Sequence, residues 1–454
     1  MDIKKFLLFS VVVLCPSLFV NADDGDVITL VTDQNVEMVF KVLDEENKIL
    51  QVGTGECDNV SAVPYRFTGD LIIPAEINGY KVKSIGDYAF RGTSVTNVII
   101  SEGIEKIGDK MFYGRCRNLV SVTIPSTVSE IGIYEPVDGY ECFCEQYSKT
   151  IISDIGSWCG VKKNGGCFWR NLYIGDNLIS EIEIPQGVTT IEARTFAITN
   201  VFDNIKLPSS LKKICHLAFN MSTLYLDDPS KCIIPTLVIP ENVDTIESYA
   251  FSSKIQCDSL IFKGGVKYIG KSAFRYFTEC ELILPEGTEN VCEYAFDNNN
   301  NIELLSLPST LTKLGKFAFN DMKSIKNILS YNENPPVIDK SSFGSWKLNY
   351  GVDSGDGNSD LVIENPDNPS YGYETAKLFV PRASIEKYKT TENWKRFKEI
   401  YAIEDFDTIN GIDNLKAPNK TNINNSTYDL QGRQLKEEPS HGIYIKDGKK
   451  VMKK

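Results

Sequence analysis

The sequence predicts a mainly β protein, a solenoid of about ten coils of 22–24 residues each. A template recurs in frame four times between residues 237 and 319, as LVIPENVDTIESYAF, LIFKGGVKYIGKSAF, LILPEGTENVCEYAF and LSLPSTLTKLGKFAF. Its closing phenylalanines, Phe251, Phe274, Phe296 and Phe319, lie 23, 22 and 23 residues apart. Such regular self-similarity is the sequence signature of a solenoid. The template also ends, upstream and downstream of this block, at Phe90, Phe112, Phe196, Phe219 and, in degraded form, Phe343.

Each part of the template has a physical reason. A short L-x-I/L run places two apolar side chains inward around one outward residue, which is the pattern of a strand. Proline ends the strand because it cannot donate to a ladder. The V-x-x-I-G segment supplies a second inward pair, and its glycine permits a tight corner. The A-F pair then sends an aromatic ring inward, so we expect the phenylalanines to stack at about 4.8 Å per coil.

Residues 1–22 are expected to be a signal peptide. A basic start at Lys4 and Lys5 precedes an apolar run, and small residues near Ala22 suit a cleavage site. A retained anchor is disfavoured because the run is short. A lipoprotein signal at Cys15 is disfavoured by the residues on either side of it. The mature chain is therefore expected to be exported, at the cell surface or extracellular, with no membrane span.

The rest of the chain divides into four predicted parts. Residues 23–66 alternate like a β-hairpin and would cap the open first coil. The solenoid occupies 67–404, with insertions near 133–152, 227–234 and 344–373, and its last part predicts a helix capped by Ser384 that closes the other end. Residues 405–426 are polar and predict a linker. Residues 427–454 contain two strand patterns and predict a short C-terminal β segment.

The recurring L-x-IP-x-x-V-x-x-IG-x-x-AF resembles the BspA-like leucine-rich repeat, over roughly residues 60 to 404. The tail, YDLQGRQL…GIYIKDGKKVMKK, is similar to short C-terminal sorting segments of exported bacterial surface proteins. The BspA-like family includes surface adhesins that bind host extracellular-matrix proteins. The resemblance therefore implies surface display and binding, without naming a ligand.

Charge and motif content argue against several other functions. The formal net charge of −13 makes nucleic acid and anionic membranes poor partners. The chain has two histidines, His216 in a variable repeat position and His441 in the tail, so Ser-His and Cys-His catalysis are disfavoured. No phosphate-binding loop or dinucleotide fingerprint occurs. We expect no catalytic residues, no cofactor and no metal, and therefore not an enzyme.

Three groups of residues are candidates for disulfide, core-packing or metal-binding roles. The cluster Cys142, Cys144, Cys159 and Cys167 lacks the spacing of a zinc site, and both a disulfide and unpaired packing remain possible there. Cys215 and Cys292 fall in the repeat column that otherwise holds glycine, where they would be small core residues. Acidic residues between 356 and 367 have a spacing like that of a calcium loop, but without the glycine that such a loop requires.

The outward residue of each L-x-I/L strand is expected to form a column across the sheet. Its members are Ile72, Ile99, Thr123, Glu183, Lys206, Val238, Ile261, Ile283, Ser306 and Phe379. Three consecutive members, Val238, Ile261 and Ile283, are apolar although they are expected to face solvent. Such a stripe marks a candidate contact surface. The alternatives are β-branched residues chosen for strand fit, or cover from the insertion at 227–234.

These observations favour a non-enzymatic, surface-displayed or secreted solenoid that binds a protein or glycan partner, such as a host or matrix component. A purely structural component of a surface assembly is the first alternative. A glycan-active enzyme or accessory protein with its site in the inserted loops, 133–167 or 344–373, is the second.

Overall fold

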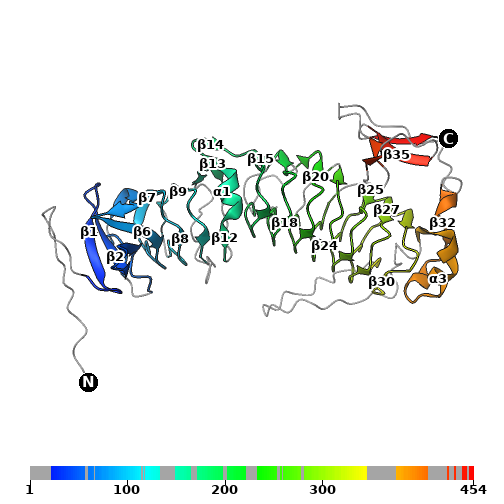
Figure 1. Cartoon of the computed structure of the whole chain (residues 1–454), viewed down its shortest axis with the longest axis horizontal. Coiled ribbons are helices and arrows are strands. Elements are labelled where there is room, and N and C mark those ends of the chain that lie inside the picture. The colour runs from blue at the N-terminus through cyan, green and yellow to red at the C-terminus, as the bar shows by residue number, and fades with distance from the viewer. Residues whose placement is uncertain are drawn as a thin grey trace, which may run out of the picture. The chain divides into compact units, whose positions relative to one another are not determined.

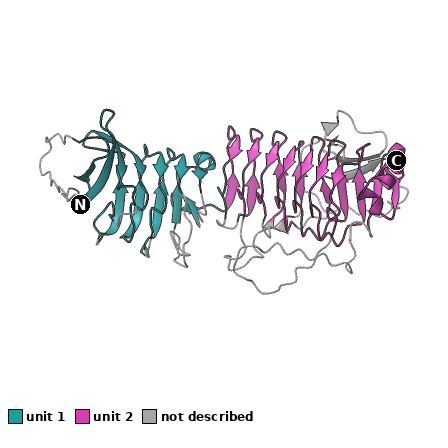
Figure 2. Cartoon of the chain, turned by 90° about the horizontal axis from the view of Figure 1, so that it is seen from below, with its two compact units in different colours: residues 1–180, 192–200 teal, residues 181–191, 201–454 magenta. Residues whose placement is uncertain are grey.

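The structure is a computed structural model that is mainly β, as the sequence predicts, with few helices (Figure 1). The residues that it describes are 22–56, 60–65, 67–113, 116, 118–132, 149–164, 171–197, 202–220, 233–252, 256–257, 259–277, 281–344, 375–406 and the tail strands within 427–453. They form two compact units, residues 1–180 with 192–200 and residues 181–191 with 201–454 (Figure 2). No helix among them is long and apolar enough to cross a membrane.

Unit 1 consists of coils whose strands pair in two parallel ladders. The outer ladder contains β4 (Thr68–Ile73), β7 (Ser94–Ile100), β9 (Ser121–Ile124), β11 (Lys149–Ile152) and β13 (Leu172–Ile174), and β14 (Asn177–Leu178) adds antiparallel to β13. The second ladder contains β6 (Tyr80–Ile85), β8 (Lys106–Ile107), β10 (Glu130–Ile131) and β12 (Lys162–Lys163), with β5 (Glu76–Ile77) beside β6. A short helix, α1 (Ile155–Gly160), precedes β12.

Unit 2 repeats this arrangement. One parallel ladder contains β16 (Thr190–Ile191), β18 (Lys213–Ile214), β21 (Thr245–Ile246), β24 (Tyr268–Ile269), β26 (Asn290–Val291), β28 (Lys313–Leu314) and β30 (Val337–Ile338). The other strands form three two-stranded sheets and one five-stranded sheet. The pairs are β15 (Glu181–Glu183) with β17 (Asn204–Lys206), β20 (Leu237–Ile239) with β23 (Leu260–Phe262), and β19 (Ile233–Ile234) with β22 (Gln256–Cys257). The five-stranded sheet has the order β25 (Glu281–Ile283), β27 (Leu304–Leu307), β29 (Asn327–Ser330), β31 (Lys377–Val380), β32 (Ile400–Ala402). The tail strands β33 (Thr427–Tyr428), β34 (Gln434–Leu435), β35 (Gly442–Lys446) and β36 (Lys449–Lys453) form a separate antiparallel sheet.

The template phenylalanines stack in the interior, as predicted. In unit 2 the ring centroids of consecutive members are 4.9, 5.3, 5.3, 5.6 and 5.5 Å apart, with interplanar angles of 3° to 15°. The members of this stack are Phe219, Phe251, Phe274, Phe296, Phe319 and Phe343. In unit 1, Phe90 and Phe112 stack at 5.7 Å. All of these rings are buried. From Phe219 to Phe343, one aromatic side chain per coil therefore forms a continuous apolar column in unit 2.

Left-handed backbone recurs two residues before eight of the template phenylalanines, Phe343 being the exception. At these positions φ lies between 51° and 59°, although none of the residues is glycine or asparagine; they are Tyr88, Lys110, Arg194, Leu217, Tyr249, Ser272, Tyr294 and Phe317. This conformation turns the corner's N–H groups toward the next coil. Tyr249 donates to the carbonyl of Lys271 and Phe251 to that of Ala273, both at 2.8 Å. The hydrogen bonds between coils thus offset a cost of about 1–2 kcal/mol per residue.

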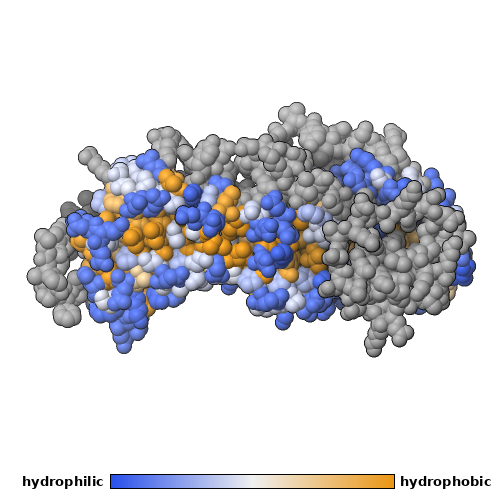
Figure 3. All heavy atoms as spheres, turned by 90° about the horizontal axis from the view of Figure 1, so that it is seen from above, coloured by the Kyte–Doolittle hydropathy of each residue, from blue (hydrophilic) through white to orange (hydrophobic). Residues whose placement is uncertain are grey.

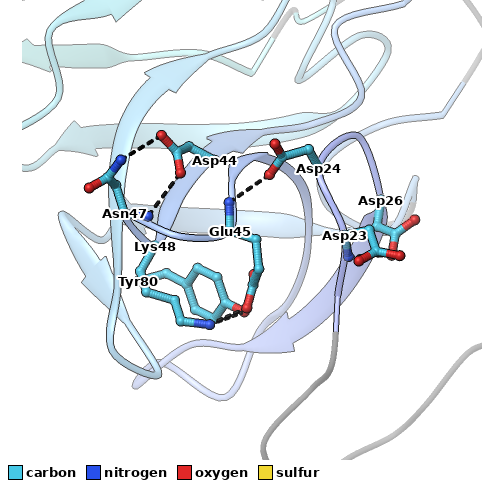
Figure 4. Close-up of polar contacts among 8 residues, drawn as sticks. All are labelled: Asp23, Asp24, Asp26, Asp44, Glu45, Asn47, Lys48 and Tyr80. Carbon is cyan, nitrogen blue, oxygen red and sulfur yellow. Dashed lines mark hydrogen bonds and ion pairs between the residues drawn. The ribbon is translucent and has the colours of Figure 1, made fainter.

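The N-terminal segment forms the predicted hairpin and adds a third strand. β1 (Val27–Val31), β2 (Glu37–Asp44) and β3 (Ile49–Val52) are antiparallel, and β3 continues in parallel into β6 of the first coil. Figure 4 shows how the β2–β3 turn is fastened to that coil: Glu45 accepts a 2.8 Å hydrogen bond from the Tyr80 hydroxyl and pairs with Lys48. The hydrogen bonds from Lys48 and Tyr80 lower the pKa of Glu45.

The C-terminal end is closed by α3 (Ile385–Thr390) and the 3-10 turn η4 (Trp394–Arg396). Their side chains bond carbonyl groups along the last short strand. Trp394 Nε1 donates to Pro336 and Asn393 Nδ2 to Ile338, each at 2.8 Å. Ser384 occupies the N-cap position of α3, as expected, but its hydroxyl makes no capping hydrogen bond. It donates instead to the Glu333 carbonyl at 2.9 Å and fastens the lid to the coil.

The phenylalanine stack predicts a large stability effect from one deletion. Phe274→Ala should destabilise unit 2 by about 3–5 kcal/mol, because it leaves a cavity between two stacked rings. Urea unfolding followed by circular dichroism measures this change. Val337→Ala, at an exposed position of the same unit, serves as the control and should change stability by no more than about 0.5 kcal/mol. Equal effects of the two changes would contradict the stack's role.

The left-handed corner predicts that replacing two lysines of unit 1 by valine has different effects on stability. Lys110→Val should destabilise by about 1–2 kcal/mol, because a β-branched residue is strained at φ 51°. Lys106→Val, in β8, should be close to neutral because valine suits a strand. Thermal or urea unfolding of both variants measures the difference. A comparable loss of stability in Lys110→Gly would show that the side chain, and not the backbone, matters there.

Candidate binding surface

The outer sheet of unit 1 carries a column of side chains across six strands that is apolar except at Thr123. The registered partners, in order, are Ile72, Ile99, Thr123, Ile151, Tyr173 and Leu178. Ile72 and Ile99 are 41% and 43% exposed, and Leu178 is also exposed. Neighbouring strands lie about 4.8 Å apart, so the column extends about 24 Å. Figure 3, which looks onto the molecule from above, shows apolar side chains gathered along the middle of this region between polar ones.

A row of polar side chains runs beside the apolar column. The Asp70 carboxylate accepts hydrogen bonds from the Thr96 hydroxyl and the Asn97 amide, both at 2.6 Å. Asn97 in turn accepts from the Ser121 hydroxyl at 2.6 Å. The hydrogen bonds from Thr96 and Asn97 lower the pKa of Asp70. These groups hold one another in fixed positions, so the face presents an ordered polar edge next to an apolar strip.

The far end of the face combines charge with an aromatic ring. The Lys149 ammonium lies 4.9 Å from the centroid of the Tyr173 ring. Both residues are half-buried and come from adjacent paired strands, β11 and β13. A lysine held over an aromatic face provides hydrogen-bond donors beside an apolar surface. The face therefore offers apolar, acidic and basic groups on one rigid sheet.

The three site residues expected from the sequence lie on unit 2. Val238 on β20 and Ile261 on β23 are directly opposite each other, and Ile261 is 38% exposed. Ile283 lies on β25, which belongs to another sheet, where it is opposite Ser306. The structure thus places Val238 and Ile261 side by side in one ladder, whereas Ile283 lies on the first strand of the following sheet. Whether the three bind anything stays a prediction.

Two members of the expected outward column are not at the surface. Ser306 and Phe379 are buried, although their strand positions point away from the coil interior. Phe406, which follows η5 (Ile403–Asp405), packs edge-on against Phe379 with ring centroids 4.9 Å apart. Leu304 and Leu329 complete this outer cluster. The expectation of an exposed position at Phe379 failed because the chain returns over the sheet after its last strand.

The sequence pattern did not reveal three residues of the unit 1 face. Ile151, Tyr173 and Leu178 lie where the template is interrupted. A signal was present: the run KTIIS at 149–153 has the same alternation as SVTIP at 121–125. In the structure these two runs pair residue for residue, from Lys149 opposite Ser121 to Ile152 opposite Ile124.

Carboxylates of the coils are used in contacts between coils. Glu102 accepts hydrogen bonds from the backbone N–H and hydroxyl of Ser126, each at 2.9 Å. Glu286 makes the same pair with Ser309, at 2.9 and 2.8 Å. Burial alone would raise the pKa of Glu102, but the hydrogen bonds from Ser126 and Thr127 leave it lowered. Lysine–glutamate pairs link successive coils elsewhere, at Lys83–Glu105, Lys106–Glu130, Lys206–Glu183, Lys213–Glu247, Lys271–Glu293 and Lys326–Glu303.

Other candidates for chemistry have packing roles or lie outside the described residues. The His216 ring packs edge-on against Tyr249 of the next coil, at 5.9 Å. Cys159 is a buried thiol, and burial raises its pKa to about 12. The described part of the chain contains no group of three or more metal-ligating His, Cys, Asp or Glu side chains. The remaining candidates, Cys142, Cys144, Cys167, His441 and the calcium-like run at 356–367, lie outside the described residues.

Comparison with solved structures found leucine-rich repeat proteins. The pneumococcal vaccine antigen PcpA is 17% identical with a TM-score of 0.39, covering 84% of this chain and 99% of its own. A leucine rich cell surface protein from Faecalibacterium prausnitzii is 16% identical (TM-score 0.38; 86% and 98%). A leucine-rich repeat protein from Eubacterium ventriosum is 20% identical (TM-score 0.37; 73% and 99%). No curated protein matches the chain.

A family model gives the assignment. The model described as "BspA type Leucine rich repeat region" matches six copies, over residues 65–136, 170–227 and 230–349, which is more than half of the sequence. These ranges include the phenylalanine corners described above and most strands of the ladders, but not β11, β12, β31 or β32. The chain therefore belongs to the BspA-type leucine-rich repeat family.

Proposed function

We propose that this protein is a non-enzymatic binding protein, exported to the cell surface or the extracellular space, that recognises a protein or glycan ligand such as a host or matrix component. The observation that carries the proposal is the exposed apolar column of unit 1 on a rigid parallel sheet. Apolar strips bordered by polar groups are typical of contact surfaces. The family membership supports a recognition role.

The fixed positions of the strands and polar side chains of the unit 1 face favour binding. The four inner strands of the sheet, β7, β9, β11 and β13, are paired on both sides, and the polar row is already hydrogen-bonded. Little conformational entropy is therefore lost when a ligand docks. Many charged side chains elsewhere on the coils are engaged in pairs between coils. These pairs give the charges a structural role and favour recognition over catalysis.

Export is the second part of the proposal. It rests on the expected signal peptide at residues 1–22, of which 1–21 lie outside the described residues, and on the resemblance of the tail to sorting segments. The unit 2 residues Val238, Ile261 and Ile283 remain a second proposed contact surface. We give the unit 1 face precedence because its column is registered across more strands.

Three matched variants test the proposal. The chain from Asp23 onward is first screened against matrix proteins and polysaccharides, and the affinity for each ligand found is then measured by biolayer interferometry. Ile99→Asp should weaken binding at least about tenfold, because it places a charge in the centre of the apolar column. Ile261→Asp tests the second surface in the same way. Val337→Asp adds the same charge at an exposed position of another ladder and should leave affinity unchanged.

Circular dichroism must show that the variants are folded. Loss of affinity in Ile99→Asp alone assigns the ligand to unit 1, and loss in Ile261→Asp alone moves the site to unit 2. Binding that resists both changes would refute recognition through either outer face. If no protein or polysaccharide binds the unmodified chain, the structural-assembly alternative replaces the proposal.

A further inference from the structure

β1 leaves one edge of the N-terminal sheet open. It is the first strand in the order β1-β2-β3-β6, and no described residue pairs with its other side. Val39, which lies opposite Thr29, donates its N–H to Ala62 and accepts from Gly53, both at 2.8 Å and away from β1. Bonding alternates along an antiparallel ladder. The N–H and C=O groups of Val27, Thr29 and Val31 therefore point outward from the sheet.

This edge lacks the features that normally protect one. The strand reads VITLV, without lysine, proline or a bulge. Val27 and Val31 are 52% and 40% exposed, whereas Leu30 is buried against the cap. By contrast, the last short strand of unit 2 has its carbonyl groups bonded by Trp394 and Asn393. The open backbone groups of β1 specify what fits there, namely another β-strand.

The strand is complementary to itself. If two copies of β1 run antiparallel about a two-fold axis at Thr29, Val27 of each copy lies opposite Val31 of the other, and Ile28 lies opposite Leu30. The three outward-pointing residues then face one another with their N–H and C=O groups in register, giving six hydrogen bonds by the geometry of an antiparallel pair. Thr–Thr and β-branched pairs are favourable opposite each other. A two-fold contact of this kind closes after two copies.

We propose that β1 is a homodimerisation edge, at which β1 of a second copy of this chain adds antiparallel about Thr29. This inference goes beyond the proposed function, because it concerns a surface on a different sheet from the apolar column. Two copies joined in this way present two binding faces, and simultaneous engagement raises apparent affinity for a repetitive surface. The contact is small compared with the roughly 1,200–2,000 Å² of stable interfaces, so the dimer is weak, with a micromolar or higher dissociation constant.

The salt dependence of binding distinguishes a second copy of this chain from a foreign strand at the β1 edge. Asp23, Asp24 and Asp26 precede β1, and Asp33 follows it. In the symmetric pair Asp33 lies close to Asp24 and Asp26 of the other copy, so like charges oppose association. Salt screens this repulsion, and the dimer should therefore strengthen as ionic strength rises. A basic foreign strand would be attracted to the same aspartates and would bind less tightly in salt.

Sedimentation equilibrium on residues 23–454, from micromolar to millimolar concentration, measures the dimer. Thr29→Pro removes one outward N–H without touching the bonds to β2, and it should raise the dissociation constant at least about tenfold. Its control, Thr29→Val, should retain the dimer. Val31→Glu should also abolish association, whereas Leu43→Glu, which adds the same charge at another exposed position of the cap, should not.

A disulfide cross-link between two copies tests whether the two-fold axis lies at Thr29. Thr29→Cys should give a disulfide-linked dimer under mild oxidation, because the two Cα atoms would be about 5.5 Å apart, within the range that a disulfide spans. Leu43→Cys is the control, and peptide mapping must place the bond at position 29. A monomer at all concentrations, association that survives both Thr29→Pro and Val31→Glu, or a dimer that weakens in salt would each overturn the proposal. None of these results depends on ligand binding.

Discussion

Hydrogen bonds between the backbones of successive coils are the constraint on which the rest of each unit depends. Successive coils bond each other at the outer strand, the short second strand and the corner before the phenylalanine, although the outer ladder of unit 2 is interrupted between β17 and β20 and between β23 and β25. Because these bonds lie along the stack, each coil must repeat the path of the previous one. The repeat of the sequence is the consequence, and the stacked rings of Phe251, Phe274 and Phe296 fill the space that this repetition leaves.

The same constraint separates structural from functional side chains. Positions at the corners and along the coil sides carry groups that bond to the adjacent coil, such as Glu102 with Ser126 and Lys106 with Glu130. The outward position of the strand makes no such contribution to the ladder. Its side chains can therefore vary without loss of the fold, and an exposed apolar residue there, such as Ile99, is available for contact with a partner.

A ladder of this kind has an open edge at each end, and the N-terminal and C-terminal segments of the chain cover these edges in different ways. At the C-terminal end, side chains of the lid bond the carbonyl groups of the last coil, and Phe406 covers the outer face. At the N-terminal end, an antiparallel hairpin replaces the missing coil and is fastened by Glu45 and Tyr80. That solution moves the edge outward to β1, whose other side pairs with no described residue. Such an edge follows from closing a parallel stack with strands.

The sequence by itself determined the repeat, its period, the inward residues and the interior stack, because each is written as a periodic pattern of apolar side chains. It also located the hairpin and the lid. Tertiary structure decided the rest. The left-handed corner could not be predicted, since residues such as Tyr249 and Leu217 do not favour it and only hydrogen bonds to the next coil stabilise it. Likewise, Ile151 joined the outer face through pairing across an insertion, and Phe379 left it through packing with Phe406, because exposure depends on contacts between residues far apart in the chain.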